Sequence, residues 1–320
     1  MLIFILRRLY QTVIVVIGVV FLISLLMSIL PGDVALMRAP KGATEEMLQN
    51  IRDKYNLDEP FMTRFWLYLK GLPTFDLGES YTYKRPVMDI IAESLPWSIK
   101  LALVAEVIIV IFGLLAGIIS AISRYSFWDV LVTITTSVLV AFPIFWIGRL
   151  LQLVFAQWLG WLPAAGAPPP GTGFPASMQY YIMPAVALAA ISTAYVARMQ
   201  RSSLLEVMRQ DYIQTARAKG LSNRRVTYKH ALKNGLIPVV TYIGIDFGVL
   251  IGAAVLTEFI FNWPGVGHKL YNAVLQRDAP MVLGLVFVLV LIFVFINLVV
   301  DISYAFLDPR IRLGGGEEVT

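Results

Sequence analysis

Six long apolar segments constrain the fold of this chain more than any other feature. A helix needs about 20 apolar residues to cross a bilayer core that is ~30 Å thick, and each segment has about that length. Hydrophobic residues make up 58% of the chain and charged residues 15%, whereas soluble domains carry about 25% charged residues. One soluble core cannot hide so much apolar surface, so we predict an all-α integral membrane protein. The six predicted transmembrane helices are residues 9–30, 98–122, 130–156, 180–197, 239–261 and 280–306.

Composition also narrows the chemistry. The chain contains no cysteine, which excludes a disulfide framework, a thiol nucleophile and a cysteine metal site. His230 and His268 are too few and too far apart in sequence to suggest a metal cluster, so no metal ligand is predicted. We attribute the net charge of +5 to membrane topology rather than to nucleic-acid binding.

The first apolar segment could be mistaken for a signal peptide, because Arg7 and Arg8 precede it. The apolar run of a signal peptide has about 7–15 residues. This one covers residues 9–30, and no evident small-residue cleavage site follows it. We therefore expect a first span that is retained.

The distribution of Lys and Arg predicts the orientation, since short cytoplasmic loops carry an excess of both. Nine of them lie between positions 198 and 233, with only two acids, Glu206 and Asp211. The loop 157–179 has no charge, and the loop 261–279 has two basic residues. With the basic loop inside, both termini lie in the cytoplasm. The other basic residues on the inside are then Arg7, Arg8, Arg124, Arg310 and Arg312.

The longest loop, residues 31–96, would then lie outside the membrane. It carries eight basic and ten acidic residues together with several aromatic ones, which indicates a small folded module. Residues 44–55 and 60–69 predict short helices, and residues 76–78 and 84–86 predict turns. The chain thus divides into a first transmembrane helix (1–30), an extracytoplasmic module (31–96), a five-helix core (97–306) that contains a cytoplasmic loop (198–237), and a cytoplasmic tail (307–320).

Small residues recur at helical spacing in two of the predicted spans. Such stripes let helices approach closely in lipid. We expect them to pack within one subunit, with packing against a partner subunit as the alternative for the fifth span. The stripes are Gly113, Gly117 and Ala121 in the second span, and Gly244, Gly248 and Gly252 in the fifth.

Few ionisable residues lie inside the spans, where they usually face the bundle interior or a cavity. Asp246 is the first candidate for a substrate pathway, and Glu106 and Glu258 are further candidates. The alternative is a polar contact between helices, which we favour for Asp301.

The basic loop carries ordered helix signals. Ser203 and Glu206 form a capping box, which predicts the start of a helix. Gly220 can end that helix, because glycine readily takes the left-handed conformation. The residues expected on one apolar face of this helix are Leu204, Leu205, Met208, Tyr212 and Ala216.

A second helix is predicted after the glycine. Ser222 can cap a helix over residues 223–233, Asn234 and Gly235 can end it, and Pro238 suits the first turn of the fifth span. Three interpretations remain open at this point. The loop is an ordinary positively charged inside loop, a site for anionic lipids, or a docking element for a cytoplasmic partner.

The loop resembles the cytoplasmic EAA loop of binding-protein-dependent ABC transporter permeases. It is most similar to the dipeptide, oligopeptide and nickel branch. The family pattern of E-A-A followed three residues later by G aligns with Gln214, Thr215, Ala216 and Gly220. The first two positions depart from the general pattern, although Thr-Ala-Arg-Ala-Lys-Gly is typical of the peptide branch.

The resemblance extends over nearly the whole chain, because several short motifs follow in the family's order. Each motif alone is weak, but the ordered set is specific. The matching motifs are Arg7-Arg8, Leu30-Pro31-Gly32-Asp33, Asp76-Leu77-Gly78 with Ser80, Arg85-Pro86-Val87, Glu258-Phe259-Ile260-Phe261, Pro264-Gly265-Val266-Gly267, Arg277-Asp278 with Pro280, and Asp301, Tyr304 and Asp308-Pro309-Arg310.

The resemblance implies a six-span permease of the type I ABC importer fold in a prokaryotic inner membrane. Such a subunit pairs with a second, homologous permease, two cytoplasmic ATPases and an extracytoplasmic solute-binding protein, which the module 31–96 could receive. It implies peptide import, with nickel complexes or oligosaccharides as the alternative cargo. The ATPase-coupling residues that it implies are Gln214, Thr215, Ala216, Arg217, Lys219, Gly220 and Leu221.

Other classes of protein remain as alternatives. The chain has no G-x-x-x-x-G-K-[ST] pattern, so ATP and Mg²⁺ are expected on the partner ATPases, with no cofactor and no catalytic residue in this chain. A secondary transporter would show inverted repeats and interrupted spans, and the sequence indicates neither. A channel is the other transport alternative. A membrane enzyme would need a converging Ser/His/Asp or metal constellation, whereas the two histidines are predicted on opposite faces of the membrane.

Overall fold

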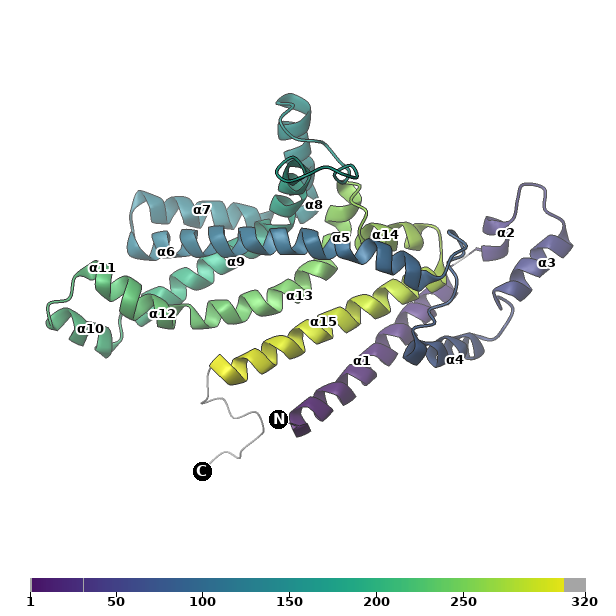
Figure 1. The fold of residues 1–320 in the computed structure, drawn as a ribbon, viewed down its shortest axis with the longest axis horizontal. Coiled ribbons are helices and arrows are strands. Elements are labelled where there is room, and N and C mark those ends of the chain that lie inside the picture. Colours follow the sequence, from purple (N-terminus) through teal and green to yellow (C-terminus); the bar gives the residue numbers. More distant parts are fainter. Residues whose placement is uncertain (1, 31, 308–320) are drawn as a thin grey trace. The chain divides into compact units, whose positions relative to one another are not determined.

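The computed structural model describes residues 2–30 and 32–307 (Figure 1). The motif residues Pro31 and Asp308-Pro309-Arg310, the inside charge Arg312 and the predicted tail lie outside these residues. Across the described part of the chain the structure is helical, with an isolated bridge between Glu79 and Pro86 and no strand. The predicted fold class is confirmed.

Five helices are long and apolar enough to cross a membrane, and a bent pair makes a sixth span if it is counted as one. The second span begins well before its predicted start, because the helix runs through Pro96 while Ile90 and Ile91 pack in a core. The five are α1 (Leu2–Ile29), α5 (Val87–Ile108) continued by η2 (Ile109–Gly113) and α6 (Leu114–Ile122), α9 (Met178–Val207), α13 (Ile237–Ile260) and α15 (Ala279–Leu307).

The predicted third span over residues 130–156 is wrong as a single helix. The structure has α7 (Phe127–Ala141), then α8 (Ile144–Leu151) with its continuation η3 (Gln152–Trp158), bent by 106° at the break. Pro143 explains the break, since proline lacks an N–H group and forces the residue before it out of the helical region. Phe142 accordingly has φ −99° and ψ 138°. The expectation of uninterrupted spans therefore fails at this point.

The chain separates into two compact units. Among the described residues, the first takes in those up to Pro96 and residues 265–295, and the second takes in Trp97–Pro264 and residues 296–307. In the first unit the predicted module helices are confirmed as α3 (Glu45–Lys54) and α4 (Phe61–Gly71). Phe21 of α1 meets Phe61 and Phe65 of α4 edge to face, at 5.6 and 5.3 Å between ring centroids.

A buried carboxylate holds the loop between the two predicted turns of the first unit in place. Asp278 lies just before α15 and is fully buried. It accepts hydrogen bonds from the Ser80 hydroxyl at 2.6 Å and from the backbone N–H groups of Tyr81 and Thr82 at 3.1 and 2.9 Å. The remaining helices of this unit are α2 (Val34–Arg38), η1 (Leu72–Thr74) and α14 (Val266–Leu275).

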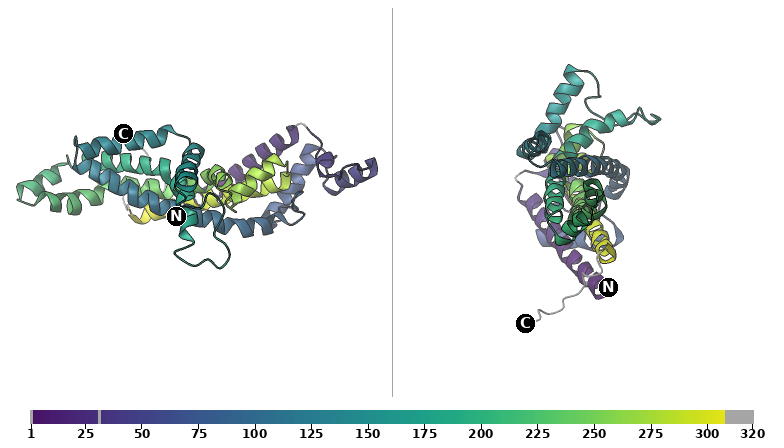
Figure 2. Two further views of the ribbon diagram at one scale, coloured as in Figure 1. Left: turned by 90° about the horizontal axis from the view of Figure 1, so that it is seen from above. Right: turned by 90° about the vertical axis from the view of Figure 1, so that its left-hand side faces the viewer.

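In the second unit α9 is the central helix and lies against α6, α7, α8 and α13. Figure 1 and the left-hand view of Figure 2 show α6, α7 and α9 side by side. A side chain at Gly113 or Gly117 would come within 2.7 Å of Val196 or 2.5 Å of the Ala197 carbonyl. The predicted close packing of the second span is therefore confirmed within this subunit.

The glycine stripe of the fifth span behaves differently along its length. A Cβ at Gly244 would approach Val300 to 2.9 Å, but a Cβ at Gly252 would have nothing within 4 Å. Gly252 is exposed in this chain. The stripe thus packs inside the subunit at one end and presents an open small-residue surface at the other.

Candidate functional site: the basic segment after α9

The basic segment, residues 198–238, begins inside α9 rather than with a new helix. The helix continues to Val207, so the predicted start at Ser203 and its capping box are wrong. The reason is packing, since Leu204 is fully buried and belongs to a core cluster with Ile213 and Ala216. The chain then turns at Gln210, which is extended with φ −68° and ψ 149°. The next helix, α10 (Asp211–Ala218), therefore starts later than predicted.

The expected apolar face from Leu204 to Ala216 does not lie on one helix. The same side chains nevertheless meet, because α10 folds back so that Leu204, Ile213 and Ala216 share the cluster and Leu205 and Met208 pack at its edge. The fold thus achieves the predicted burial by a turn between two helices.

The turn at Gly220 is confirmed. Gly220 has φ +80°, a conformation that favours glycine. Its N–H donates to the Arg217 carbonyl at 2.9 Å, and the Leu221 N–H donates to the Ala216 carbonyl at 3.4 Å. A Cβ at Gly220 would have nothing within 4 Å. The turn is therefore an open one, fixed by backbone conformation and not by crowding.

The second predicted helix is also confirmed, with its cap. The Ser222 hydroxyl accepts from the Arg225 N–H at 3.4 Å. Helical structure then runs to Gly235, and Pro238 lies in the first turn of α13. The elements are α11 (Asn223–Arg225), the π-helical η4 (Val226–Ala231) and α12 (Leu232–Gly235).

The seven coupling residues that the resemblance implies divide into two groups, one packed inside the subunit and one exposed. Ala216 is buried and Leu221 is half-buried, and both pack in the subunit's own cluster. The other five are exposed on α10 and at the turn: Gln214, Thr215, Arg217, Lys219 and Gly220. We call these five residues the α10 surface.

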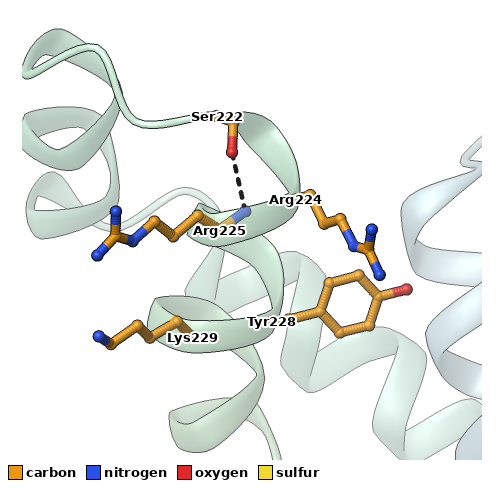
Figure 3. Close-up of a pocket in the computed structure, with 5 residues that line it drawn as sticks. All are labelled: Ser222, Arg224, Arg225, Tyr228 and Lys229. Carbon is orange, nitrogen blue, oxygen red and sulfur yellow. Dashed lines mark hydrogen bonds between the residues drawn. The ribbon is translucent and has the colours of Figure 1, made fainter.

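A second exposed group lies on α11 and η4. Figure 3 shows Arg225 and Lys229 projecting to one side of the helix, and Arg224 and Tyr228 to the other. With Ser222 they line an open recess of about 560 Å³. No salt bridge neutralises these three cations among the residues that the structure describes. This surface can attract an anionic partner.

An ion pair fastens the base of the segment. Arg201 of α9 donates to Asp129 of α7 through Nε at 2.8 Å and through Nη2 at 2.9 Å. The Ser120 hydroxyl of α6 also donates to this carboxylate, as does the Tyr125 N–H at 2.9 Å. Asp129 is 4% exposed. We call Asp129, Arg201 and Ser120 the Asp129 clamp, and it joins α6, α7 and α9.

Sequence reasoning missed the clamp. In the sequence Arg201 is one of nine basic residues of the loop, and no local pattern pairs it with Asp129. The available signal was an aspartate in the first turn of an apolar segment, since a charge there needs a partner if it is buried.

The structure brings two of the three pathway candidates together. Asp246 of α13 is buried, and its Oδ2 is enclosed and has no hydrogen-bond partner among the described residues. Glu106 of α5 lies close enough to Asp246 for their charges to interact. Both Glu106 carboxyl oxygens are enclosed and have no hydrogen-bond partner among the described residues.

The third candidate lies elsewhere on the same helix. Glu258 is three turns further along α13, about 18 Å away at 1.5 Å per residue. It is completely buried and receives a hydrogen bond from the Ser98 hydroxyl. The Glu258 carbonyl also accepts from the Trp263 N–H at 2.8 Å. Asp301, expected at a polar contact, is half-buried in α15.

A helical protein with five or six spans, enclosed carboxylates and an exposed, braced basic segment has the features of a membrane transport subunit. The comparisons with known proteins agree with this class. The chain belongs to the family of binding-protein-dependent transport system inner membrane components, whose model matches residues 113–313. A second model, for the N-terminal region of such components, matches residues 1–102. The predicted family is confirmed.

The chain is similar over its full length to several named permeases. It is 39% identical to a dipeptide transport system permease protein of Alkalihalophilus pseudofirmus, covering 98% of this chain and 100% of that protein. It is 42% identical to a putative peptide transport system permease protein of Brucella abortus, covering 96% and 98%. It is 40% identical to a glutathione transport system permease protein of Escherichia coli, covering 98% and 99%.

Solved structures show the same fold. A MetNI methionine ABC transporter in an inward-facing conformation matches 69% of this chain and 97% of its own chain, with a TM-score of 0.55 and 16% identity. An amino acid ABC transporter matches 70% and 95%, with a TM-score of 0.51 and 16% identity. The chain is thus a permease subunit of an ABC importer, and the predicted type I importer fold is confirmed.

Proposed function

We propose that this permease subunit moves short peptides across the membrane. The observation that carries the proposal is full-length similarity to permeases named for dipeptides, peptides and glutathione, which is itself a small peptide. Nickel complexes and oligosaccharides have no such support. Peptides would reach the permease from an extracytoplasmic solute-binding protein.

The α10 surface would be the part that an ATPase subunit grips. Its five residues are exposed, while Ile213 and Ala216 anchor the same helix to Leu204 of α9. Because of this anchoring, a pull on α10 acts on α9. Through the Asp129 clamp it also acts on α6 and α7. Closure of the ATPases around ATP would then shift the permease between its inward-open and outward-open states.

ATP and Mg²⁺ would be bound by the partner ATPases and not by this chain. We infer a complex of this subunit with a second, homologous permease, two ATPases and the solute-binding protein. The basic segment would face the cytoplasm together with both termini, in accord with the positive-inside rule. The module between α1 and α5 would then face the solute-binding protein.

The neighbouring carboxylates of Glu106 and Asp246 would contribute to the peptide pathway. Enclosed acids inside a membrane protein usually face a cavity or a partner charge, and a peptide's amino terminus offers such a charge. Glu258 is a weaker candidate, because it is completely buried and bonded to Ser98.

A pair of tryptophan substitutions tests the coupling role. Gly220→Trp places a large side chain on the α10 surface, and Gly160→Trp is the matched control. Both glycines have positive φ (+80° and +64°), and a Cβ at either would have nothing within 4 Å. We expect Gly220→Trp to abolish co-purification of the ATPases and ATP-dependent dipeptide uptake in proteoliposomes. Gly160→Trp should retain both.

Two outcomes would contradict the proposal. Normal ATPase binding with normal uptake in Gly220→Trp would show that the turn is not the contact. Uptake driven by an ion gradient without ATP would indicate a secondary transporter.

A further inference from the structure

The first unit contains a cavity of about 540 Å³ that plays no part in the proposed coupling. Its walls come from the end of α1, from α4 and from the start of α15. We propose that it holds the headgroup phosphate of an anionic phospholipid, with an acyl chain against its apolar side chains.

Three polar side chains in the cavity lining have hydrogen-bond donors without an acceptor in the described part of the chain. Arg64, Tyr68 and Ser24 all line it. The Arg64 Nε, the Tyr68 hydroxyl and the Ser24 hydroxyl are each enclosed and have no hydrogen-bond partner among the described residues. Arg64 and Tyr68 are one turn apart on α4, so they share a face. An enclosed donor without a hydrogen-bond partner is costly, and a guanidinium donor is best matched by an anionic acceptor.

The Tyr68 hydroxyl keeps its proton and can donate a hydrogen bond. Burial raises the pKa of the Tyr68 hydroxyl above its usual value, so the group stays protonated at neutral pH. It can therefore donate to a phosphate oxygen, as the guanidinium of Arg64 can.

The acids that face the cavity are already engaged. Asp33 is paired with Arg52 at 2.7 Å. Asp58 accepts from the Gln49 amide at 3.0 Å. Arg277 also lines the cavity. The lining contains three arginines, Arg52, Arg64 and Arg277, against two aspartates, so its net charge favours an anion.

Apolar side chains also line the cavity, close to the end of an apolar span. Leu30, Leu67 and Leu283 line the cavity, and α1 completes its apolar span at Ile29. On the outer side of α4, Met62 and Trp66 are 56% and 60% exposed, and tryptophan is enriched at membrane interfaces. A ligand with a phosphate at one end and a hydrocarbon chain at the other matches this mixed polar and apolar lining. The leaflet that supplies it follows from the proposed orientation.

Native mass spectrometry of the purified transporter complex tests the site, with dioleoyl phosphatidylglycerol and dioleoyl phosphatidylcholine as probes. We expect the wild-type complex to retain phosphatidylglycerol at least tenfold better than phosphatidylcholine. Arg64→Gln should weaken that retention at least tenfold. Lys70→Gln removes the same charge from an exposed position on the same helix, and it should behave as wild type.

Several results would overturn the proposal. Equal retention of phosphatidylglycerol in Arg64→Gln and Lys70→Gln would show that the cavity does not bind the lipid. Displacement by inorganic phosphate at the lipid's own concentration would indicate a free anion site, and displacement by a dipeptide would indicate a substrate site. If Arg64→Gln fails to fold, Tyr68→Phe removes one donor only. That variant should weaken retention severalfold, and unchanged retention would refute the proposal.

Discussion

Replacing Asp129 with asparagine should destabilise the subunit although the side chain keeps its shape. The carboxylate accepts from four donors, namely two on Arg201, the Ser120 hydroxyl and the Tyr125 N–H. Asparagine offers one acceptor oxygen, and its NH₂ group would face two of these donors. Two charge-assisted hydrogen bonds are therefore lost.

The expected loss follows from the environment of the pair. A hydrogen bond to a charged group contributes about 1.5–3 kcal/mol, and removing one partner of a buried ion pair costs about 3–5 kcal/mol. The Arg201 side chain is 31% exposed against 6% for Asp129. Water can therefore hydrogen-bond the Arg201 guanidinium in the variant and reduce the loss of stability. We expect Asp129→Asn to lower the free energy of unfolding by about 2–4 kcal/mol.

Unfolding of the purified subunit in mixed micelles with rising dodecyl sulfate, followed by far-ultraviolet circular dichroism, measures this change. Asp211→Asn is the control, because Asp211 is an exposed acid at the start of α10. A double-mutant cycle with Arg201→Gln isolates the pair, since independent sites are additive within about 0.5 kcal/mol. In the assembled transporter, Asp129→Asn should also lower the peptide transported per ATP hydrolysed. A loss below about 0.5 kcal/mol, or an additive cycle, would refute the reasoning.

Three further predictions concern local structure. Gly117→Val should lower the free energy of unfolding by about 1–3 kcal/mol in the same assay, because its Cβ would meet a backbone carbonyl of α9 at 2.5 Å. Gly252→Val should leave the free energy of unfolding of the isolated subunit unchanged, because its Cβ would have nothing within 4 Å. Ser222→Ala removes a helix cap and should cost about 1 kcal/mol, seen as faster amide hydrogen exchange over residues 223–226; unchanged exchange would contradict the cap. Arg52 holds the pKa of the Asp33 carboxyl below its usual value. The pair therefore stabilises the folded state fully at pH values above the usual pKa of an aspartate, and this stability is lost as the pH falls through the lowered pKa. In Arg52→Gln the Asp33 carboxyl should titrate closer to its usual value, as measured by carbon NMR, and an unmoved titration would rule the pair out as the cause.

The features that the sequence predicted correctly depend on local chemistry. The apolar runs specify helices because a bilayer leaves backbone groups no other partners. Gly220 predicts its turn because few other residues accept a positive φ. Both inferences need only neighbouring residues, and both are confirmed.

Ser203 shows where local chemistry is insufficient. A capping serine contributes about 1 kcal/mol, whereas full burial of a leucine contributes about 1.5–3 kcal/mol. Leu204 is fully buried in the cluster, so packing keeps α9 intact through the capping signal. Pro143 is the converse case, because its break in the third span was readable from one residue and was overlooked in favour of the apolar run.

The Asp129 clamp could not be derived from periodicity, since its partners are 72 residues apart in the chain. Hydropathy indicates that Asp129 begins an apolar helix, but it does not indicate which helix comes to rest beside it. The same limit applies to Glu106 and Asp246, whose proximity depends on how α5 and α13 pack. Sequence identifies residues that need partners, and the fold selects the partners.

The inward position of Ala216 bears on the proposed coupling through α10. If Ala216 served mainly to let an ATPase approach, its side chain would be exposed, but it packs with Ile213 and Leu204 inside the subunit. Coupling would therefore depend on two faces of one short helix. The outer face would contact the ATPase, and the inner face would transmit the movement to α9. Charge on the outer face can change with little effect on the transmitted movement, whereas loss of packing on the inner face lets α10 move without α9. A substitution such as Ala216→Ser, which leaves the α10 surface intact, should accordingly preserve ATPase binding and still lower the peptide transported per ATP.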